Sequence, residues 1–369
     1  MSNIKKGIGL LERETIFCVS GLAALLSALF VCPGIHYLNY LDGRVLVLLF
    51  SLMVMVAGLQ TLGVFEIMAQ SLLKRGKRLR TISLFLVGMT FFLAMVVTND
   101  VALLTMVPFT FAVLGFAGEK RIILIVIMET LAANLGSMLT PIGNPQNLFL
   151  YSYFHMNLPE FLKITFPVTL LAFVVVMAGT AIIPQRKMDV LFDVAYPELP
   201  GKPLLLYLLL FGVIIGGVFH WIPYGGVLAA ALLLGALANP YVFKQVDYYL
   251  LLTFVFFFVF VGNVGQIPWF RETVTSLIQG REILGAVILS QGMSNVPAAV
   301  VLAPFVEDPA ALILGVNVGG LGTLIASLAS VISFKLYSGR TGSRKVLYIA
   351  VFSGINFLLL GLFLAILLL

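Results

Sequence analysis

Two short polar segments interrupt apolar stretches of this sequence, and both consist of residues that cap helices. One is Thr98-Asn99-Asp100, and the other ends in Ser294-Asn295. Side chains of this kind accept hydrogen bonds from the free backbone N–H groups at the start of a helix. The N–H groups that stay free, together with the helix dipole, attract an anion. We therefore expect Thr98, Asn99, Asp100, Ser294 and Asn295 to bind a small anion in addition to capping helices.

Two further segments contain residues that a helix cannot accommodate. Residues 140–147 hold two prolines and a glycine, and residues 319–323 hold three glycines, so each segment is expected to break a helix. Unwound carbonyls together with Asn and Thr oxygens make sites for hard cations, whereas a kink that only shapes packing is the simpler alternative. We assign Asn144 and Thr323 to binding of the anion. The residues expected to couple a cation or a proton are Asn134, Thr140, Gly143, Asn317 and Gly319.

Two acidic residues lie within apolar segments. Asp100 is at the first polar tip, and Glu129 is about two turns inside a helix expected to start near Arg121. A charge deep in an apolar segment is costly and usually functional, so both acids are candidates for proton or cation coupling. The alternatives are a plain helix cap for Asp100 and a protonated, hydrogen-bonded carboxylic acid for Glu129.

The elements that position these residues must be membrane helices. The chain has 369 residues, of which 61% are hydrophobic and 10% charged, and its mean hydropathy is +1.10. Soluble domains contain about 25% charged residues, so the bilayer is the solvent that suits this sequence. We predict an all-α polytopic membrane protein with nine crossings. Residues 81–118 and 281–306, each interrupted by a polar tip, are expected to form re-entrant hairpins.

The distribution of positive charge predicts the orientation of the chain. Cytoplasmic loops of membrane proteins are enriched in Lys and Arg. With the N-terminus in the cytoplasm, 18 of the 22 Lys and Arg residues fall in inside segments. We therefore expect a multi-pass inner-membrane protein with a cytoplasmic N-terminus. The bilayer is its expected partner, and the sequence has no basic amphipathic stretch suited to nucleic acid.

The two halves of the sequence align with each other. Residues 41–65 match 246–270, and residues 131–147 match 314–330. Five predicted crossings separate the two starts, so the second copy is inverted, which is typical of alternating-access carriers. The expected units are a first inverted repeat over 1–183 (hairpin 81–118, broken helix 121–153), a cytoplasmic linker plus connecting transmembrane helix over 184–224, and a second inverted repeat over 225–369 (hairpin 281–306, broken helix 309–334).

Other classes of function lack their motifs. The sequence has no metalloprotease helix pair, nucleophile elbow or phosphate loop, so we do not expect an enzyme. The polar linker at 184–202 is too short for the motor domain of an ATP-driven pump. We expect no cofactor and no metal site, with Na⁺ or H⁺ as the coupling ion.

The polar segments resemble motifs of the ion transporter superfamily, which includes citrate carriers, divalent-anion/sodium symporters, arsenite efflux permeases and NhaD-type sodium/proton antiporters. The similarity covers nearly the whole chain and is greatest to YbiR-type inner-membrane proteins; its motifs are 98–103, 134–137 with 140–147, and 294–297 with 317–320. The resemblance implies a homodimer. It also implies that the hairpin tips hold the substrate, and that the tips and the broken helices together hold sodium. Asp100 and Val296 stand where carboxylate symporters carry threonine, and Asn144 where several relatives carry an acid.

Two classes of transport remain open. The leading hypothesis is a secondary active transporter that moves a small anion, a carboxylate or an inorganic oxyanion, coupled to Na⁺ or H⁺ by alternating access. The alternatives are a Na⁺/H⁺ antiporter that moves no organic solute and an arsenite-type efflux permease. The sequence does not name the substrate, the coupling ion or the direction of transport.

Overall fold

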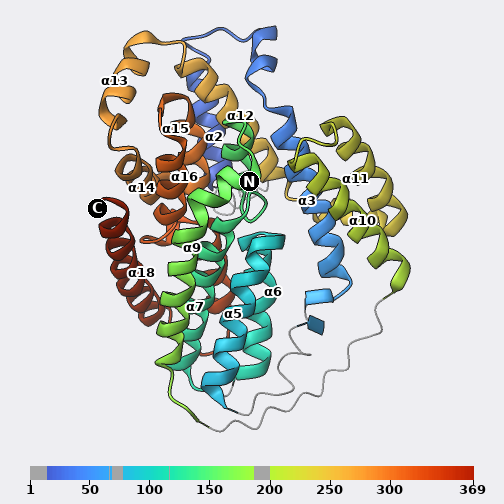
Figure 1. Ribbon diagram of the computed structural model, residues 1–369, viewed down its shortest axis with the longest axis vertical. Helices are drawn as coiled ribbons and strands as arrows, with labels where there is room; N and C mark the ends of the chain where they lie inside the picture. Colours follow the sequence, from blue (N-terminus) through green and yellow to red (C-terminus); the bar gives the residue numbers. More distant parts are fainter. Residues whose placement is uncertain (1–14, 66, 69–77, 116, 187–199) are drawn as a thin grey trace, which may run out of the picture.

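The computed structural model describes residues 15–65, 67–68, 78–115, 117–186 and 200–369, and this part of the chain is helical (Figure 1). The predicted all-α class is therefore confirmed for it. In chain order its α-helices are α2 (Thr15–Ser27), α3 (Gly43–Thr61), α5 (Leu79–Val97), α6 (Asn99–Leu114), α7 (Glu119–Gly136), α8 (Pro145–Tyr153), α9 (Leu158–Ala181), α10 (Gly201–Val218), α11 (Tyr224–Ala238), α12 (Tyr248–Val264), α13 (Pro268–Ile278), α14 (Glu282–Met293), α15 (Asn295–Leu302), α16 (Pro309–Gly319), α17 (Leu328–Ser338) and α18 (Lys345–Leu367). Short 3-10 helices are η1 (Ile35–Tyr40), η2 (Ser137–Leu139), η3 (Pro240–Gln245), η4 (Ala303–Phe305) and η5 (Leu324–Ala326).

Long apolar helices make this a multi-pass membrane protein. Within the described ranges, six helices are long and apolar enough to cross a bilayer, and a seventh is obtained if α12 and α13, bent by 104°, count as one span. The other crossings predicted from sequence correspond to the shorter α2 and α11 and to the interrupted pair α16–α17. Helix α5 is long enough to cross by itself, although the sequence pattern assigned it to a hairpin.

Helix α7 is enclosed by other helices over most of its surface. It packs against α5, α6, α9 and α17, and 89% of its apolar window is buried inside the protein. The corresponding share is only 28% for α18, which lies at the edge of the molecule (Figure 1). Helices α3, α10 and α11 pack together on another side (Figure 1). Most side chains on α7 are therefore shielded from lipid, whereas α18 presents most of its surface to it.

Two helical hairpins carry the predicted polar tips. Helices α5 and α6 meet at Thr98, and helices α14 and α15 meet at Ser294. Both residues adopt positive φ, 92° at Thr98 and 74° at Ser294, which is strained for residues with a Cβ and is often found at functional sites. Re-entry into the membrane from one side stays a prediction for both hairpins.

Two interrupted helices pack against the hairpins. Helix α7 continues through η2 to an unwound segment before α8, and α16 is followed by an unwound segment before η5 and α17. The first helix of each hairpin packs on the interrupted helix of its own half, α5 on α7 and α14 on α16. The second helix packs on interrupted helices of both halves, α6 on α7 and α17, and α15 on α16 and α8. The two halves are thus interlocked at their polar segments.

Side-chain contacts join predicted inside segments to helix ends. Arg80 Nε donates to Ile183 O at 2.8 Å, and Thr61 Oγ1 donates to Gln245 Oε1 at 3.1 Å. Arg80 and Gln245 lie in predicted inside segments, and their partners lie in predicted crossings. Arg44 Nη2 donates to Gly217 O at 2.9 Å on the predicted outside. The orientation of the N-terminus stays a prediction, because residues 1–14 lie outside the described part, as does most of the polar linker at 187–199.

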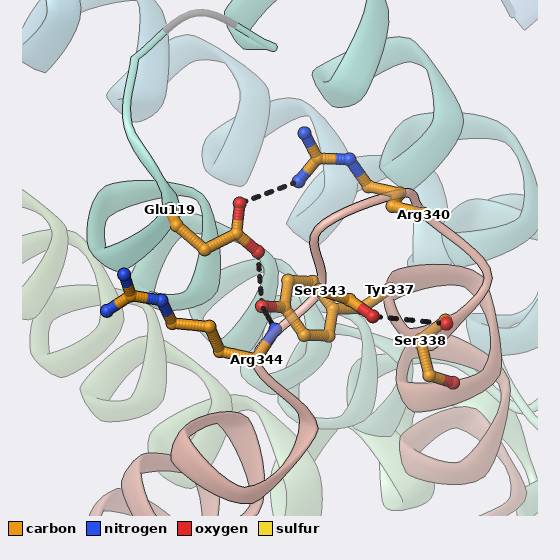
Figure 2. A network of polar contacts seen from close by, with 6 residues as sticks. All are labelled: Glu119, Tyr337, Ser338, Arg340, Ser343 and Arg344. Carbon is orange, nitrogen blue, oxygen red and sulfur yellow. Dashed lines mark hydrogen bonds and ion pairs between the residues drawn. The ribbon is translucent and has the colours of Figure 1, made fainter.

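A polar network fastens the start of α7 to the end of α17 (Figure 2). The Tyr337 hydroxyl donates to the Glu119 carboxylate, and Arg340 pairs with the same carboxylate at 3.6 Å. The backbone N–H of Arg344 donates to the Tyr337 oxygen at 2.9 Å, and the Arg340 guanidinium lies 4.6 Å from the centre of the Phe111 ring. This network ties one interrupted helix to the other at a distance from the breaks.

Candidate substrate and coupling site

Asn317, on the interrupted helix of the second half, reaches across to the break of the first half. Its Nδ2 donates to Asn147 Oδ1 at 2.6 Å and to Ile313 O at 2.7 Å. Its Oδ1 accepts from Asn144 Nδ2 at 3.0 Å. Asn144 also caps α8 by accepting from the Asn147 N–H at 2.9 Å. The side chains of Asn317, Asn144 and Asn147 are buried, so this amide cluster is a fixed part of the core.

Asn134 makes the corresponding contacts in the opposite direction. Its Oδ1 accepts from Ser327 Oγ at 2.8 Å, and its Nδ2 donates to Ser330 Oγ at 3.3 Å. Positions 134, 144 and 147 correspond to 317, 327 and 330 under the sequence alignment, at a constant offset of 183. Each of the two asparagines, Asn134 and Asn317, therefore bonds two residues of the opposite half, and the two pairs of partners occupy matching positions in the alignment.

In each half, a threonine of the break donates a hydrogen bond to a backbone carbonyl of the hairpin. Thr140 Oγ1 donates to Met95 O in the first half, and Thr323 Oγ1 donates to Gln291 O at 3.1 Å in the second. The Asn99 backbone N–H donates to Gly143 O at 3.0 Å. Because each hydrogen bond connects a hairpin to an unwound segment, the tip and the break in each half hold a fixed relative position.

Two glycines let the backbones approach. A Cβ placed on Gly136 would lie 2.4 Å from Phe91 O, and one on Gly319 would lie 2.8 Å from Ser290 Oγ. These distances are too short for a methyl group, so glycine is needed where α7 meets α5 and where α16 meets α14. Gly319 was predicted as a site residue, whereas the packing role of Gly136 was not.

Side-chain amides occupy both breaks. Asn147 Nδ2 lies 3.3, 3.1 and 3.2 Å from the carbonyl oxygens of Ser137, Met138 and Thr140. Sequence reasoning left Asn147 out of the site, although it lies within the segment that was expected to unwind. Gln291, from the second tip, places its amide nitrogen against backbone carbonyls of the second break, and it was also left out of the predicted site.

Gln291 binds the second break through both ends of its carboxamide. Its Nε2 donates to Gly319 O at 2.9 Å and to Leu321 O at 3.0 Å. Its Oε1 accepts from the Thr323 N–H at 2.9 Å. Three backbone groups that the interruption frees from helical bonding are therefore satisfied by one side chain.

A cavity of about 180 Å³ lies beside the first tip. Its polar lining combines the tip, the first break, α3 and the start of α12: Gln60, Thr98, Asp100, Asn144, Gln245 and Asp247. Among the described residues that line it, none is Lys, Arg or His. Asp247 caps α12 by accepting from the Leu250 N–H at 3.0 Å, and it was not predicted as a site residue. Two carboxylates facing one cavity repel each other, so a bound proton or cation stabilises the pair.

Asp100 is the predicted acid that faces this cavity. Its Oδ1 is buried and has no hydrogen-bond partner within the described part of the chain. Glu129 lies elsewhere. It precedes Asn134 on α7 by about 7 Å, given the rise per residue of an α-helix. One Glu129 oxygen accepts from Thr110 Oγ1 at 2.6 Å, and the other has no described partner. The structure thus separates the two acids that the sequence treated as equivalent candidates.

The second tip does not line this cavity. Ser294, Asn295 and Thr323 are absent from the described residues around it and lie at the second break instead. Ser294 Oγ is buried without a described hydrogen-bond partner, and Asn295 is also buried. The structure therefore brings Thr98, Asp100 and Asn144 to one cavity. It places the predicted residues of the second half at a separate, closely packed point.

Comparisons with known proteins identify the group to which these features belong. The family described as citrate transporter matches residues 11–313. The chain belongs to the citrate transporter family. An uncharacterized transporter of Methanocaldococcus jannaschii is 31% identical over 334 residues, which cover 89% of this chain and 90% of the relative.

Two further relatives are membrane proteins. The inner membrane protein YbiR of Escherichia coli is 31% identical over 307 residues, covering 81% of each chain. A 46 kDa membrane protein of Mycobacterium leprae is 26% identical over 344 residues, covering 80% of this chain and 79% of the relative. With the family and the apolar helices, these relatives establish a multi-pass membrane transporter.

Proposed function

We propose that this transporter is a secondary active carrier that moves a small anion, a carboxylate or an inorganic oxyanion, across the inner membrane by alternating access. Membership of the citrate transporter family supports an organic anion, and the relative in Escherichia coli supports the inner membrane. The coupling ion is Na⁺ or H⁺.

The observation that carries this proposal is the set of paired hydrogen bonds between the two halves. Asn134 bonds Ser327 and Ser330, while Asn317 bonds Asn144 and Asn147. Equivalent contacts in both directions support two inverted copies that share one interface. Copies of this kind can exchange conformations, so that a site between them opens first to one side of the membrane and then to the other.

The charge of the cavity supports coupling of anion transport to a proton or cation. Asp100 and Asp247 repel an anion, and no basic side chain among the described lining residues offsets them. The free N–H groups at the start of α6 attract an anion only weakly against two carboxylates. A proton or cation that neutralises one carboxylate removes this repulsion, so the two ions bind together more readily than either alone.

The same two carboxylates favour a second candidate, a cation/proton antiporter. Such a protein needs a carboxylate that exchanges a proton for a cation, and it needs no anion site. An arsenite-type efflux permease stays an alternative, because an uncharged acid is not repelled by Asp100.

A thermal-shift panel tests the proposal. The purified protein is heated with citrate, succinate, phosphate or sulfate, because a ligand that binds the folded state raises its apparent stability. At least one anion is expected to raise Tm. Asp100→Asn is expected to change the dependence of that shift on pH or on sodium, whereas Glu307→Gln, in an exposed loop, is the matched control.

Vesicles containing the protein separate the two candidates. If no anion raises Tm and an imposed sodium gradient moves protons without added anion, the antiporter replaces the anion carrier. If anions stabilise the protein and the gradient alone moves no protons, the anion carrier stands.

A further inference from the structure

Both breaks contain a side-chain nitrogen where backbone carbonyls converge. In the second half, Gln291 Nε2 is bonded to the oxygens of Gly319 and Leu321 at the break, and to Val287 O on its own helix at 3.3 Å. In the first half, Asn147 Nδ2 is surrounded by three carbonyl oxygens at 3.1–3.3 Å. An amide group has two hydrogens, so it cannot serve three acceptors fully at once. Several carbonyl oxygens that converge on one point are the arrangement expected around a hard cation.

The two halves reach this arrangement with different residues. The position that matches Gln291 in the first half is Met95, and the position that matches Asn147 in the second half is Ser330, by the offsets 196 and 183. Neither Met nor Ser can place an –NH₂ group among these carbonyls. The amide therefore comes from the hairpin in one half and from the interrupted helix in the other, although the acceptors lie at equivalent breaks.

The oxygens at these points are committed to the amides. A desolvated sodium ion takes several oxygen ligands at once, as other hard cations do. At the second break it would have to displace Gln291, whose Oε1 is also held by the Thr323 N–H at 2.9 Å. At the first break it would have to displace Asn147, whose Oδ1 accepts from Asn317 at 2.6 Å. Displacement at either point breaks contacts on both sides of the amide.

We propose that the side-chain amides of Asn147 and Gln291 take the place of sodium ions at the two breaks, so that these residues make the transporter independent of sodium. This inference rests on the proposed function, because it concerns the ion that accompanies the substrate. The carbonyls of Ser137, Met138, Thr140, Gly319 and Leu321 are structural acceptors, and they do not form a cation site while the amides are present.

Sodium-dependent stability tests the inference directly. Tm of the wild-type protein is measured in sodium chloride and in choline chloride at equal ionic strength. The two values are expected to coincide. A Tm that is higher in sodium than in choline overturns the inference.

Removing one amide should create a response to sodium. Gln291→Met installs the residue found at the matching position of the first half and frees the oxygens of Gly319 and Leu321. Sodium is expected to raise Tm of this variant above its value in choline. Gln279→Met, at an exposed position, is the matched control and should not respond. A folded Gln291→Met protein that is indifferent to sodium overturns the inference.

Asn147→Ser provides the second variant if Gln291→Met fails to fold, and it should show the same response to sodium. The anion panel, repeated in choline chloride, separates this inference from the proposed function. An anion that raises Tm equally in both salts supports both. An anion that acts only in sodium overturns the inference and leaves the anion carrier in place. If no anion acts in either salt, the anion carrier fails, while the sodium comparison still decides the inference.

Discussion

Replacing Gly136 with alanine perturbs the backbone contact between α7 and the first hairpin. The added Cβ would lie 2.4 Å from Phe91 O and 3.1 Å from Phe91 Cα. Ordinary contacts begin at 3.4 Å, so the nearest one falls short by 1.0 Å. The obstacle is backbone, which cannot rotate away as a side chain does. Helices α5 and α7 must therefore move apart, and the Asn99 contacts near the tip move with them.

The magnitude follows from two opposing effects. Overpacking a dense core costs about 1–3 kcal/mol, and a backbone obstacle places this site in the upper part of that range. Alanine recovers about 1 kcal/mol of helix propensity relative to glycine. We expect a net loss of about 2 kcal/mol in the free energy of unfolding. Gly319→Ala should lose less, because its new Cβ would lie 2.8 Å from Ser290 Oγ and 3.1 Å from the nearest backbone atom, Val287 Cα, whereas that of Gly136→Ala would lie 2.4 Å from a backbone oxygen.

Reversible unfolding in mixed detergent micelles, followed by circular dichroism, measures these differences. Gly354→Ala is the matched control, because it lies in α18 with nothing within 4 Å of its new Cβ. It should gain up to about 1 kcal/mol from propensity alone. The expected order of stability is Gly354→Ala, wild type, Gly319→Ala and Gly136→Ala. A Gly136→Ala protein as stable as Gly354→Ala would refute the close approach of α7 to α5.

Three further sets of substitutions test separate contacts. Asn317→Ala and Asn147→Ala should together cost less than the sum of their separate effects, by about 0.6 kcal/mol or more in a double-mutant cycle; strict additivity would mean that the two amides do not interact. Thr98→Gly should raise the unfolding free energy by about 1 kcal/mol, because glycine adopts a φ of 92° without strain; a loss would show that the tip is not strained. Asp308→Ala should lower it by about 1 kcal/mol, because Asp308 caps α16 through the N–H groups of Ala310 and Ala311; Asp308→Asn, which keeps the cap, should be nearly neutral.

Helix ends were the most predictable feature of this protein. Helix α8 begins at Pro145 after the Asn144 cap, α16 begins at Pro309 after the Asp308 cap, and α6 begins at Asn99 within the first tip. These boundaries depend on which backbone groups a residue and its near neighbours can bond, and that information is local in sequence. The alignment of the two halves also anticipated that asparagines 134 and 317 would occupy equivalent positions.

Positions within the candidate site were less predictable. The sequence grouped both tips in one pocket, whereas the cavity beside Asp100 includes the first tip and excludes the second. It assigned Gly319 to cation binding, whereas Gln291 reaches its carbonyl. It did not select Asp247, which reaches the cavity although 147 positions separate it from Asp100.

The sequence by itself determined that this chain crosses a bilayer and where its helices break. The expected capping at the two tips was wrong, because neither Thr98 nor Ser294 makes a side-chain cap hydrogen bond. Apolar length, proline and glycine act on the few residues around them, so their effect can be read along the chain. Only the tertiary structure decided which polar groups meet. A buried amide or carboxylate takes its partner from whichever helix packs against it, and the packing of helices distant in sequence depends on the shape of the whole core.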